Sequence, residues 1–238
     1  MTKVAEISQP AAARLAGAMH LLAMPTASFS VYYVWPRINV PNDAAQTASN
    51  IIASEQLFRL GVLGDLITWA VDIVLILALY VLLKPVNRHV ALLAVFFRIV
   101  ETAILCVITL GSVVALLILS DADYLRAFET NQLQALAKLV LSAEGAGYNF
   151  GLIFLGFGST VFSYLFFTSR YIPRPLAAWG IFSSLVLLTG CLAMIVFPAW
   201  RAVLTPAYFA PIFLYELTLG FWLVIKGARI PPTSPQAI

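Results

Sequence analysis

The sequence predicts an all-α protein, a polytopic integral membrane helical bundle with six transmembrane helices and an amphipathic outer helix. The chain has 238 residues, of which 61% are hydrophobic and 11% are charged. Soluble domains are about 45–50% apolar and about 25% charged. The chain also contains six apolar stretches, each long enough for the ~20 residues with which a helix crosses a bilayer. They cover residues 11–35, 57–83, 91–119, 145–167, 176–197 and 207–226.

The first stretch is predicted to be a retained transmembrane span, because it is too long for the apolar core of a signal peptide. Aromatic residues gather at its outer end, as is typical of the belt at a membrane interface. These residues are Phe29, Tyr32, Tyr33 and Trp35. Pro25 in mid-span predicts a kink.

Two short connections separate the next four stretches into pairs. Residues 84–88 join the second and third stretches, and residues 169–175 join the fourth and fifth. Both contain proline, which lacks the helical N–H donor and disfavours helix in the residue before it. We therefore expect sharp helix ends at Pro85 and Pro173.

The connections on the opposite side are longer and partly helical. Residues 44–55 are predicted to form a helix that runs into the second span. Residues 125–140 have apolar side chains at helical spacing with charged residues between them. This pattern predicts an amphipathic helix at the outer interface, and an outward continuation of a spanning helix is an equally good interpretation.

Loop charges predict the orientation of the bundle. One set of span ends is basic, with only Glu6 as an acid, and the opposite set is mixed or acidic. Because basic loops stay in the cytoplasm, both termini are predicted to be cytoplasmic. Residues 1–230 are expected to form a single transmembrane domain and residues 231–238 a flexible tail. The basic set comprises Lys3, Arg14, Lys84, Arg88, Arg170, Arg174, Lys226 and Arg229.

Several function classes receive no support. Basic residues do not form the clustered face that a nucleic-acid interface requires, so membrane lipids are the expected partners. The sequence has no phosphate loop, redox CxxC pair or His-rich zinc motif, so no cofactor or metal is predicted. Cys106 and Cys191 lie inside apolar stretches and are interpreted as buried thiols.

Ionisable residues within the spans are the candidate functional groups. A charge in the hydrocarbon layer costs at least ~2.5–3.5 kcal/mol, so such residues usually face the protein interior. At 1.5 Å per helical residue, three of them lie roughly 15–18 Å from the basic ends and Glu101 lies one turn deeper than Arg98, so the four are predicted to share one layer. They are Asp72, Arg98, Glu101 and Glu216.

Further polar residues lie outside this layer. Asp65 and Asn149 are predicted to lie at a common depth nearer the outer side. His20 is nearer the basic ends, about six residues from Arg14. Glu144, close to the outer end of its span, is expected to reach water.

Arg98 is the only base among these deep groups, so the acids cannot all be ionised in a dry interior without another cation. Glu216, Asp72 and Glu101 are the candidate catalytic acids. Arg98, Asp65, Asn149 and His20 are the candidate ligand-binding residues. An Arg–carboxylate network that only locks helices together is the alternative interpretation of the same residues.

Three functions are therefore considered. The first is an intramembrane pocket for a lipophilic small molecule, in a membrane enzyme or a ligand binder. The second is a small proton- or cation-coupled transporter, with Asp65 and Asp72 on one helix face as a relay. The third is a structural or assembly protein without chemistry. The sequence leaves enzymatic activity open.

The chain also resembles a bacterial membrane protein family catalogued as domain of unknown function 4386. The resemblance covers roughly residues 10–230 and rests on several short patterns together. It implies a six-span or similar bundle in the bacterial cytoplasmic (inner) membrane and no particular activity. The patterns are the runs 13–17, 55–59, 79–86 and 169–173, with Asp72, Phe97, Arg98, Pro211, Glu216, Trp222 and Gly227.

Overall fold

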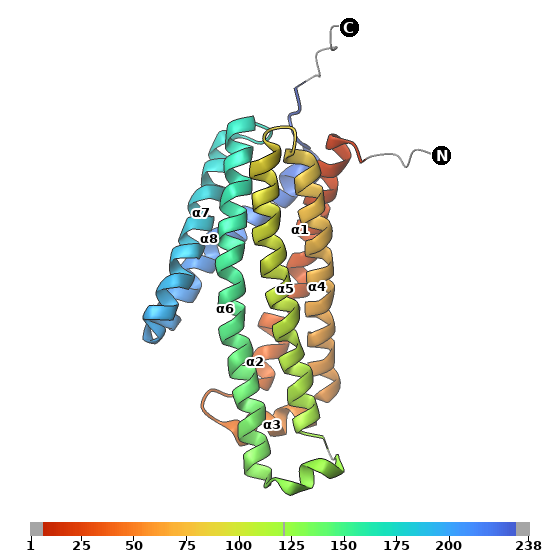
Figure 1. Cartoon of the computed structure of the whole chain (residues 1–238), viewed down its shortest axis with the longest axis vertical. Coiled ribbons are helices and arrows are strands. Elements are labelled where there is room, and N and C mark those ends of the chain that lie inside the picture. Colours follow the sequence, from red (N-terminus) through yellow and green to blue (C-terminus); the bar gives the residue numbers. More distant parts are fainter. Residues whose placement is uncertain (1–6, 121, 232–238) are drawn as a thin grey trace, which may run out of the picture. The chain divides into compact units, whose positions relative to one another are not determined.

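The computed structural model describes residues 7–120 and 122–231, and these residues form helices and no strands (Figure 1). The predicted all-α class is confirmed. Lys3 and Glu6 of the orientation argument, and the predicted tail beyond Pro231, lie outside the described residues. The helices are α1 (Gln9–Ser28), α2 (Trp35–Ile38), α3 (Ala44–Ala53), α4 (Glu55–Leu83), α5 (Arg88–Ile118), α6 (Thr130–Ser169), α7 (Arg174–Val196) and α8 (Arg201–Ile225).

Among the described residues, five helical segments are long and apolar enough to cross a membrane. They are α4, α5, α6, α7, and α8 together with the short 3-10 turn Pro198–Trp200 that precedes it. The first apolar stretch is not among them. There α1 ends at Ser28, and a π-helical segment, Phe29–Val34, follows it. A sixth span formed by residues 11–35 stays a prediction.

Local sequence signals account for the helix ends. α4 stops at Leu83, two residues before Pro85, and α7 begins directly after Pro173 with Pro175 in its first turn, where the missing N–H has no cost. Asp43 caps α3, because its Oδ1 accepts a hydrogen bond of 2.8 Å from the N–H of Gln46. The predicted sharp stops at the two prolines are therefore confirmed.

The outer amphipathic segment is not a separate helix. Residues 130–140 form the first turns of the 40-residue helix α6, which continues without a break to Ser169. Residues Asp123–Ala127 form a short 3-10 helix before it. The interpretation as an outward continuation of a spanning helix is thus confirmed, and the prediction of a separate outer helix was wrong.

The chain folds into two compact units whose boundaries fall within α1, α4, α5 and α6. Unit 1 comprises described residues 7–21, 74–98 and 155–231, and unit 2 comprises residues 22–73 and 99–154 except 121. The expectation of a single transmembrane domain over residues 1–230 stays a prediction.

Unit 1 brings the basic ends of several helices together. Gln9 at the start of α1 donates from Nε2 to the carbonyl of Leu82 (2.9 Å) and to the hydroxyl of Tyr171 (3.3 Å). Arg229, after α8, donates its N–H to the carbonyl of Tyr171 (2.8 Å). α7 and α8 pack side by side in this unit (Figure 1).

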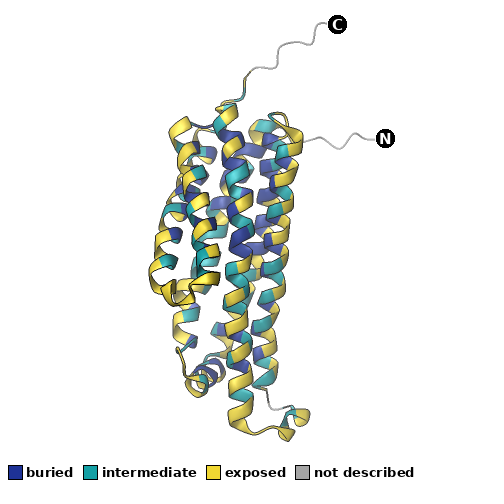
Figure 2. Cartoon of the chain, turned by 60° about the vertical axis from the view of Figure 1, so that its left-hand side comes forward, coloured by how far each residue is buried: buried dark blue, intermediate teal, exposed yellow. Residues whose placement is uncertain are grey.

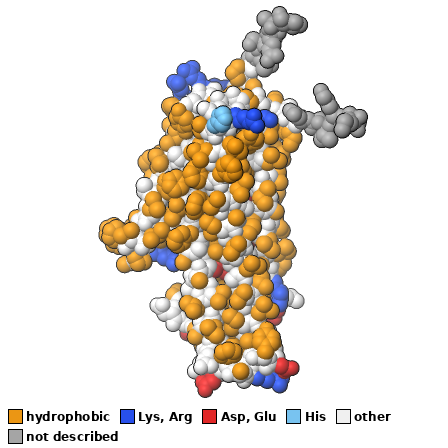
Figure 3. Space-filling model, in the orientation of Figure 1, with side chains coloured by type: hydrophobic (Ala, Val, Ile, Leu, Met, Phe, Trp, Pro, Cys, Tyr) orange, Lys and Arg blue, Asp and Glu red, His pale blue; other side chains and the backbone are white. Residues whose placement is uncertain are grey.

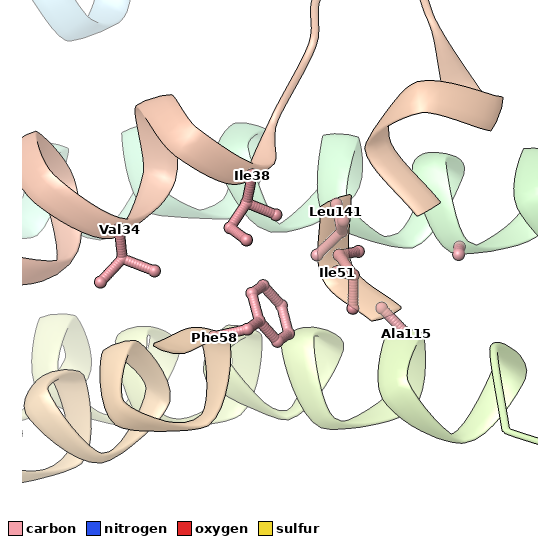
Figure 4. Packing of buried hydrophobic residues seen from close by; sticks show 7 residues of the cluster. Val34, Ile38, Ile51, Phe58, Ala115 and Leu141 are labelled. Carbon is pink, nitrogen blue, oxygen red and sulfur yellow. The ribbon is translucent and has the colours of Figure 1, made fainter. Parts of the chain in front are cut away.

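Unit 2 has a hydrophobic core that joins the end of the first stretch to α3, α4, α5 and α6. Figure 4 shows Phe58 of α4 and Ile38 of α2 directed toward one another, with Ile51 of α3 beside them. The seven buried members of this core are Val34, Ile38, Ile51, Phe58, Ala115, Ala137 and Leu141.

The exterior of the long helices is apolar. Along the long helices, buried residues alternate with exposed ones (Figure 2). Hydrophobic side chains cover most of the face seen in Figure 3. Leu77 is 52% exposed, Val107 is 65% exposed and Ile225 is 68% exposed. Soluble proteins rarely expose such large apolar areas, so these strips are the surface that a bilayer covers.

Candidate functional site

A small cavity of about 20 Å³ lies within unit 1. Its polar lining comes from α1, α5, α6 and α8, and the rest of its wall is aliphatic or aromatic. Three residues proposed from the sequence, His20, Arg98 and Glu216, lie on it together. The polar residues are His20, Arg98, Ser159, Ser163, Tyr215 and Glu216, and the apolar residues are Leu75, Leu79, Phe162, Phe166 and Leu219.

His20 brings an imidazole to the cavity from α1. The side chain is 8% exposed, and its Nδ1 lies 3.2 Å from the carbonyl oxygen of Ala16. A carbonyl only accepts hydrogen bonds, so Nδ1 carries the hydrogen in this contact. In the neutral ring, Nε2 is then the nitrogen that can accept a hydrogen bond or a proton.

Arg98 enters the cavity from α5 and is 5% exposed. A glycine on α6 makes room for its aliphatic stem. A Cβ added to Gly158 would lie only 2.7 Å from Cγ and 2.9 Å from Cδ of Arg98, closer than such atoms pack. The guanidinium is planar, always charged and offers five N–H donors, which suits it to binding carboxylate or phosphate oxygens.

Tyr215 and Ser163 form a hydrogen-bonded part of the wall. The two hydroxyl oxygens lie 2.9 Å apart, and either oxygen can be the donor. Tyr215 is 3% exposed and Ser163 is 1% exposed. Gly180 on α7 leaves the space for this contact, because a Cβ there would come within 2.6 Å of Ser163 Oγ. The pair therefore ties α6 to α8 beside the cavity.

Glu216 is the only acid among the described residues of unit 1, and its side chain is half-buried. The same residues contain nine basic side chains. The cavity therefore holds the one acidic side chain among the described residues of a strongly basic unit. The basic residues are Arg14, Lys84, Arg88, Arg98, Arg170, Arg174, Arg201, Lys226 and Arg229.

The size and chemistry of the cavity limit what it can hold. A cavity needs about 10–15 Å³ for one water molecule, so about 20 Å³ admits one or two waters or a small terminal group such as a carboxylate. Arg98 supplies donors, and Glu216 and His20 can take up protons. The arrangement is suited to holding a small polar group and exchanging a proton with it.

The other four site residues predicted from the sequence belong to unit 2. Asp72 and Glu101 are buried, at 8% and 2% exposure, and Asp65 and Asn149 are half-buried. Asp65 Oδ2 accepts a hydrogen bond of 3.0 Å from Ser30. A common layer of Asp72 and Glu101 with Arg98 and Glu216 stays a prediction.

Glu144 differs from the expectation that it simply reaches water. It is half-buried in unit 2, and its Oε2 accepts a hydrogen bond of 2.8 Å from Ser112 on α5. Gly111 lies against the same oxygen, since a Cβ added there would be 3.4 Å from it. Glu144 is therefore part of the packed interior between α5 and α6.

Sequence reasoning missed three polar residues of the cavity. Ser159 and Ser163 are four residues apart on α6 and so share a helix face, and Tyr215 directly precedes Glu216. The spacing of the serines was a usable signal, but serine is common in membrane helices and marks no site by itself. Among the described residues, no three His, Cys, Asp or Glu side chains gather as a metal site.

Comparison with known proteins identifies a family and a relative, neither of which has a described activity. A relative from Archaeoglobus fulgidus, described as an uncharacterized protein, is 29% identical over 174 residues, which cover 71% of this chain and 85% of the relative. No solved structure matches the chain. A family described as a domain of unknown function (DUF4386) matches residues 15–227. This match covers most of the chain, which therefore belongs to that family.

Proposed function

We propose that this membrane protein binds a lipophilic molecule by its anionic end, with the carboxylate or a similar group held in the cavity of unit 1. The observation that supports the proposal is the meeting of His20, Arg98 and Glu216 on one small cavity with an otherwise apolar wall. Arg98 binds the anionic group, and the hydroxyls beside it complete the polar lining. The apolar chain of the ligand remains outside the cavity.

The small volume of the cavity supports a binding mode in which only the anionic group of the ligand enters it. Pockets that enclose a whole drug-sized molecule have volumes of about 300–1,000 Å³, far more than the cavity of about 20 Å³. A head group fits, while an alkyl chain does not. The chain instead lies along the exposed apolar surface of the helices, where lipid chains lie, so its burial needs no large pocket.

Charge balance couples this binding to a proton. Arg98 stays charged, and Glu216 is the one acid among the described residues of the unit. A second carboxylate in the same confined space raises the electrostatic energy unless one of the two acids is protonated. Within this proposal Glu216 takes up that proton when the ligand binds. The same residue is the acid that a membrane enzyme acting on the bound group would use.

Proton-coupled transport is the second candidate, and a feature of unit 2 favours it. Two half-buried acids of this unit, Asp65 on α4 and Glu144 on α6, each accept a hydrogen bond from a serine. Acids inside membrane helices often carry protons along a path. Flux of protons into proteoliposomes that disappears in Glu144→Gln supports this candidate over simple binding.

We further propose that the basic ends face the cytoplasm and that the protein resides in a bacterial cytoplasmic membrane. The charge distribution of the connecting segments supports this orientation. Fusion of a fluorescent protein or of alkaline phosphatase after Ile230 tests it. Fluorescence without phosphatase activity is expected, and the reverse pattern contradicts a cytoplasmic carboxyl end.

Equilibrium dialysis with radiolabelled dodecanoate in neutral detergent tests the binding proposal. We expect saturable binding of dodecanoate and none of 1-dodecanol, which has the same chain without the charge. Arg98→Lys keeps the charge but loses the planar fork, so binding should weaken about tenfold or more, since a charge-assisted hydrogen bond contributes ~1.5–3 kcal/mol. Equal binding of dodecanoate and dodecanol, or no effect of Arg98→Lys in a monodisperse protein, contradicts the proposal.

A further inference from the structure

The basic end of unit 1 has a feature that the cavity does not explain. Arg170 directly follows α6. Its φ of 59° lies in the left-handed region, which residues other than glycine rarely adopt. Gly227 follows α8 at the same end with φ of 68° and has the residue type that this conformation favours. An arginine in a backbone conformation that favours glycine suggests the hypothesis that its side chain has a functional role.

Three further basic residues lie near Arg170 at this end of the unit. Arg174 begins α7 four residues later, and Arg229 donates its N–H to the carbonyl of Tyr171, the residue next to Arg170. Lys226 directly follows α8, three residues before Arg229. All four basic side chains are exposed. We name these four residues, Arg170, Arg174, Lys226 and Arg229, the basic junction.

Unit 1 has no acid beside the basic junction among its described residues. Among the described residues of this unit the only acid is Glu216, and it lies on the cavity in the interior of α8. Four exposed cations without an acid on the same surface attract an external anion.

Aromatic rings show the level at which these cations lie. The guanidinium of Arg174 lies 5.4 Å from the ring centre of Phe167, and that of Arg229 lies 5.9 Å from the ring centre of Trp222. Aromatic residues collect where the apolar layer meets the head groups. Just below, on α8, Phe221 is 50% exposed and Ile225 is 68% exposed.

We propose that the basic junction is a binding site for an anionic phospholipid. The phosphate and the negatively charged head group lie against the basic residues, with Arg170 as the residue that gives selectivity. The acyl chains lie along the exposed apolar side chains at the end of α8. The combination of cations above an exposed apolar strip fits a lipid better than a free phosphate, which has no chain to bury.

Native mass spectrometry of the purified full-length protein with equal amounts of phosphatidylglycerol and phosphatidylcholine tests the site. We expect preferential retention of phosphatidylglycerol. Arg170→Gly should lower the affinity for phosphatidylglycerol about fivefold, the factor that corresponds to ~1 kcal/mol per basic residue near anionic lipid. The affinity for phosphatidylcholine should not change. Arg170→Lys, which retains the charge, should keep most of the preference.

The Arg170→Gly variant is informative because glycine relaxes the backbone at this position, so we expect it to fold. The matched control is Arg201→Gln, which removes an exposed charge of the same unit from the opposite end of α8 and should leave the preference unchanged. Equal retention of both lipids, or equal losses in Arg170→Gly and Arg201→Gln, overturns the proposal. So does displacement of the lipid by inorganic phosphate at an ionic strength at which chloride has no effect.

Discussion

Ser163 of α6 and Tyr215 of α8 share a hydrogen bond of 2.9 Å in the buried wall of the cavity, directly beside Glu216. The contact links two helices that are distant in sequence, and both of its residues line the cavity with Glu216, the one acid among the described residues of unit 1. It therefore contributes both to the packing of unit 1 and to the polarity of the cavity.

The Ser163–Tyr215 contact predicts non-additive effects of mutation. Tyr215→Phe and Ser163→Ala should each lower the free energy of unfolding by roughly 0.6–1.5 kcal/mol, the range for hydrogen bonds in membrane and soluble proteins. Since each change removes the same bond, the double variant should lose little more than either single variant. Unfolding in mixed micelles with increasing SDS measures all four proteins, and fully additive losses contradict the shared bond.

Gly180 is predicted to be intolerant of a single methyl group. A Cβ at this position would overlap Ser163 Oγ and the ring of Tyr215, so Gly180→Ala should lower the free energy of unfolding by about 1–3 kcal/mol. The control is Gly64→Ala, also in a helix interior, where the Cβ meets the carbonyl of Thr26 at an ordinary 3.5 Å. That change should be neutral or stabilising. Similar losses in both variants would show that α7 does not approach the pair as described.

Lys138 is predicted to hold the connection between α2 and α3 against α6. Its ammonium donates to the side chain of Asn39, the carbonyl of Val40 (2.7 Å) and the hydroxyl of Thr47 (3.2 Å). Lys138→Met should cost about 1.5–3 kcal/mol, because three acceptors lose a charged donor. The backbone amides of residues 39–47, which are far from Lys138 in the sequence, should exchange their hydrogens faster.

The control for Lys138 is Lys226→Met, which removes an exposed lysine beyond the end of α8. Its effect on stability should stay within ~0.5 kcal/mol. Unchanged exchange of residues 39–47 in Lys138→Met would contradict the anchoring role, whatever the overall stability.

Binding of dodecanoate is predicted to tighten as the pH falls. Since the ligand carboxylate and Glu216 share one guanidinium charge, binding takes up a proton, and uptake of a proton is favoured at low pH. Uptake of one proton on binding should raise the affinity by up to about tenfold for each pH unit of acidification. Glu216→Gln should bind at all pH values with a flat profile.

His20 is the other titratable group on the cavity that can gain a positive charge, and Tyr215 and Arg98 complete the ionisable lining. His20→Gln separates the two sources of pH dependence. If Glu216 is the group that takes up the proton, the affinity of His20→Gln for dodecanoate should still depend on pH, whereas that of Glu216→Gln should not. A pH dependence lost only in His20→Gln would assign the proton to the imidazole and contradict the role of Glu216.

Much of the helical architecture was predictable from one-dimensional signals. α4 and α5 were placed within a few residues of their bounds, because an apolar run ends at Pro85 and resumes after Arg88. The π-helical segment after Ser28 was not predictable, since the aromatic residues around it are also common in regular spans. The continuity of α6 was open, because amphipathic spacing looks the same in a separate helix and in an extended one.

The candidate site was predicted only in part. Counting helical rise placed Arg98 and Glu216 at similar depths, and both lie on one cavity. Depth does not give the direction in which a side chain points around its helix. His20 was assigned a shallower position but was named as a ligand-binding candidate, and it lies on the same cavity. The hydroxyls of Ser163 and Tyr215 were missed, because depth alone does not show which side chains face the cavity.

The most direct measurement is a high-resolution structure of the protein in complex with 12-bromododecanoate, whose bromine marks the chain end and whose carboxylate marks the head. Carboxylate density is expected within hydrogen-bond distance of the Arg98 guanidinium, with the bromine outside the cavity against the apolar exterior of the helices. A carboxylate bound at the basic junction, with the cavity holding only water, would contradict the proposed function.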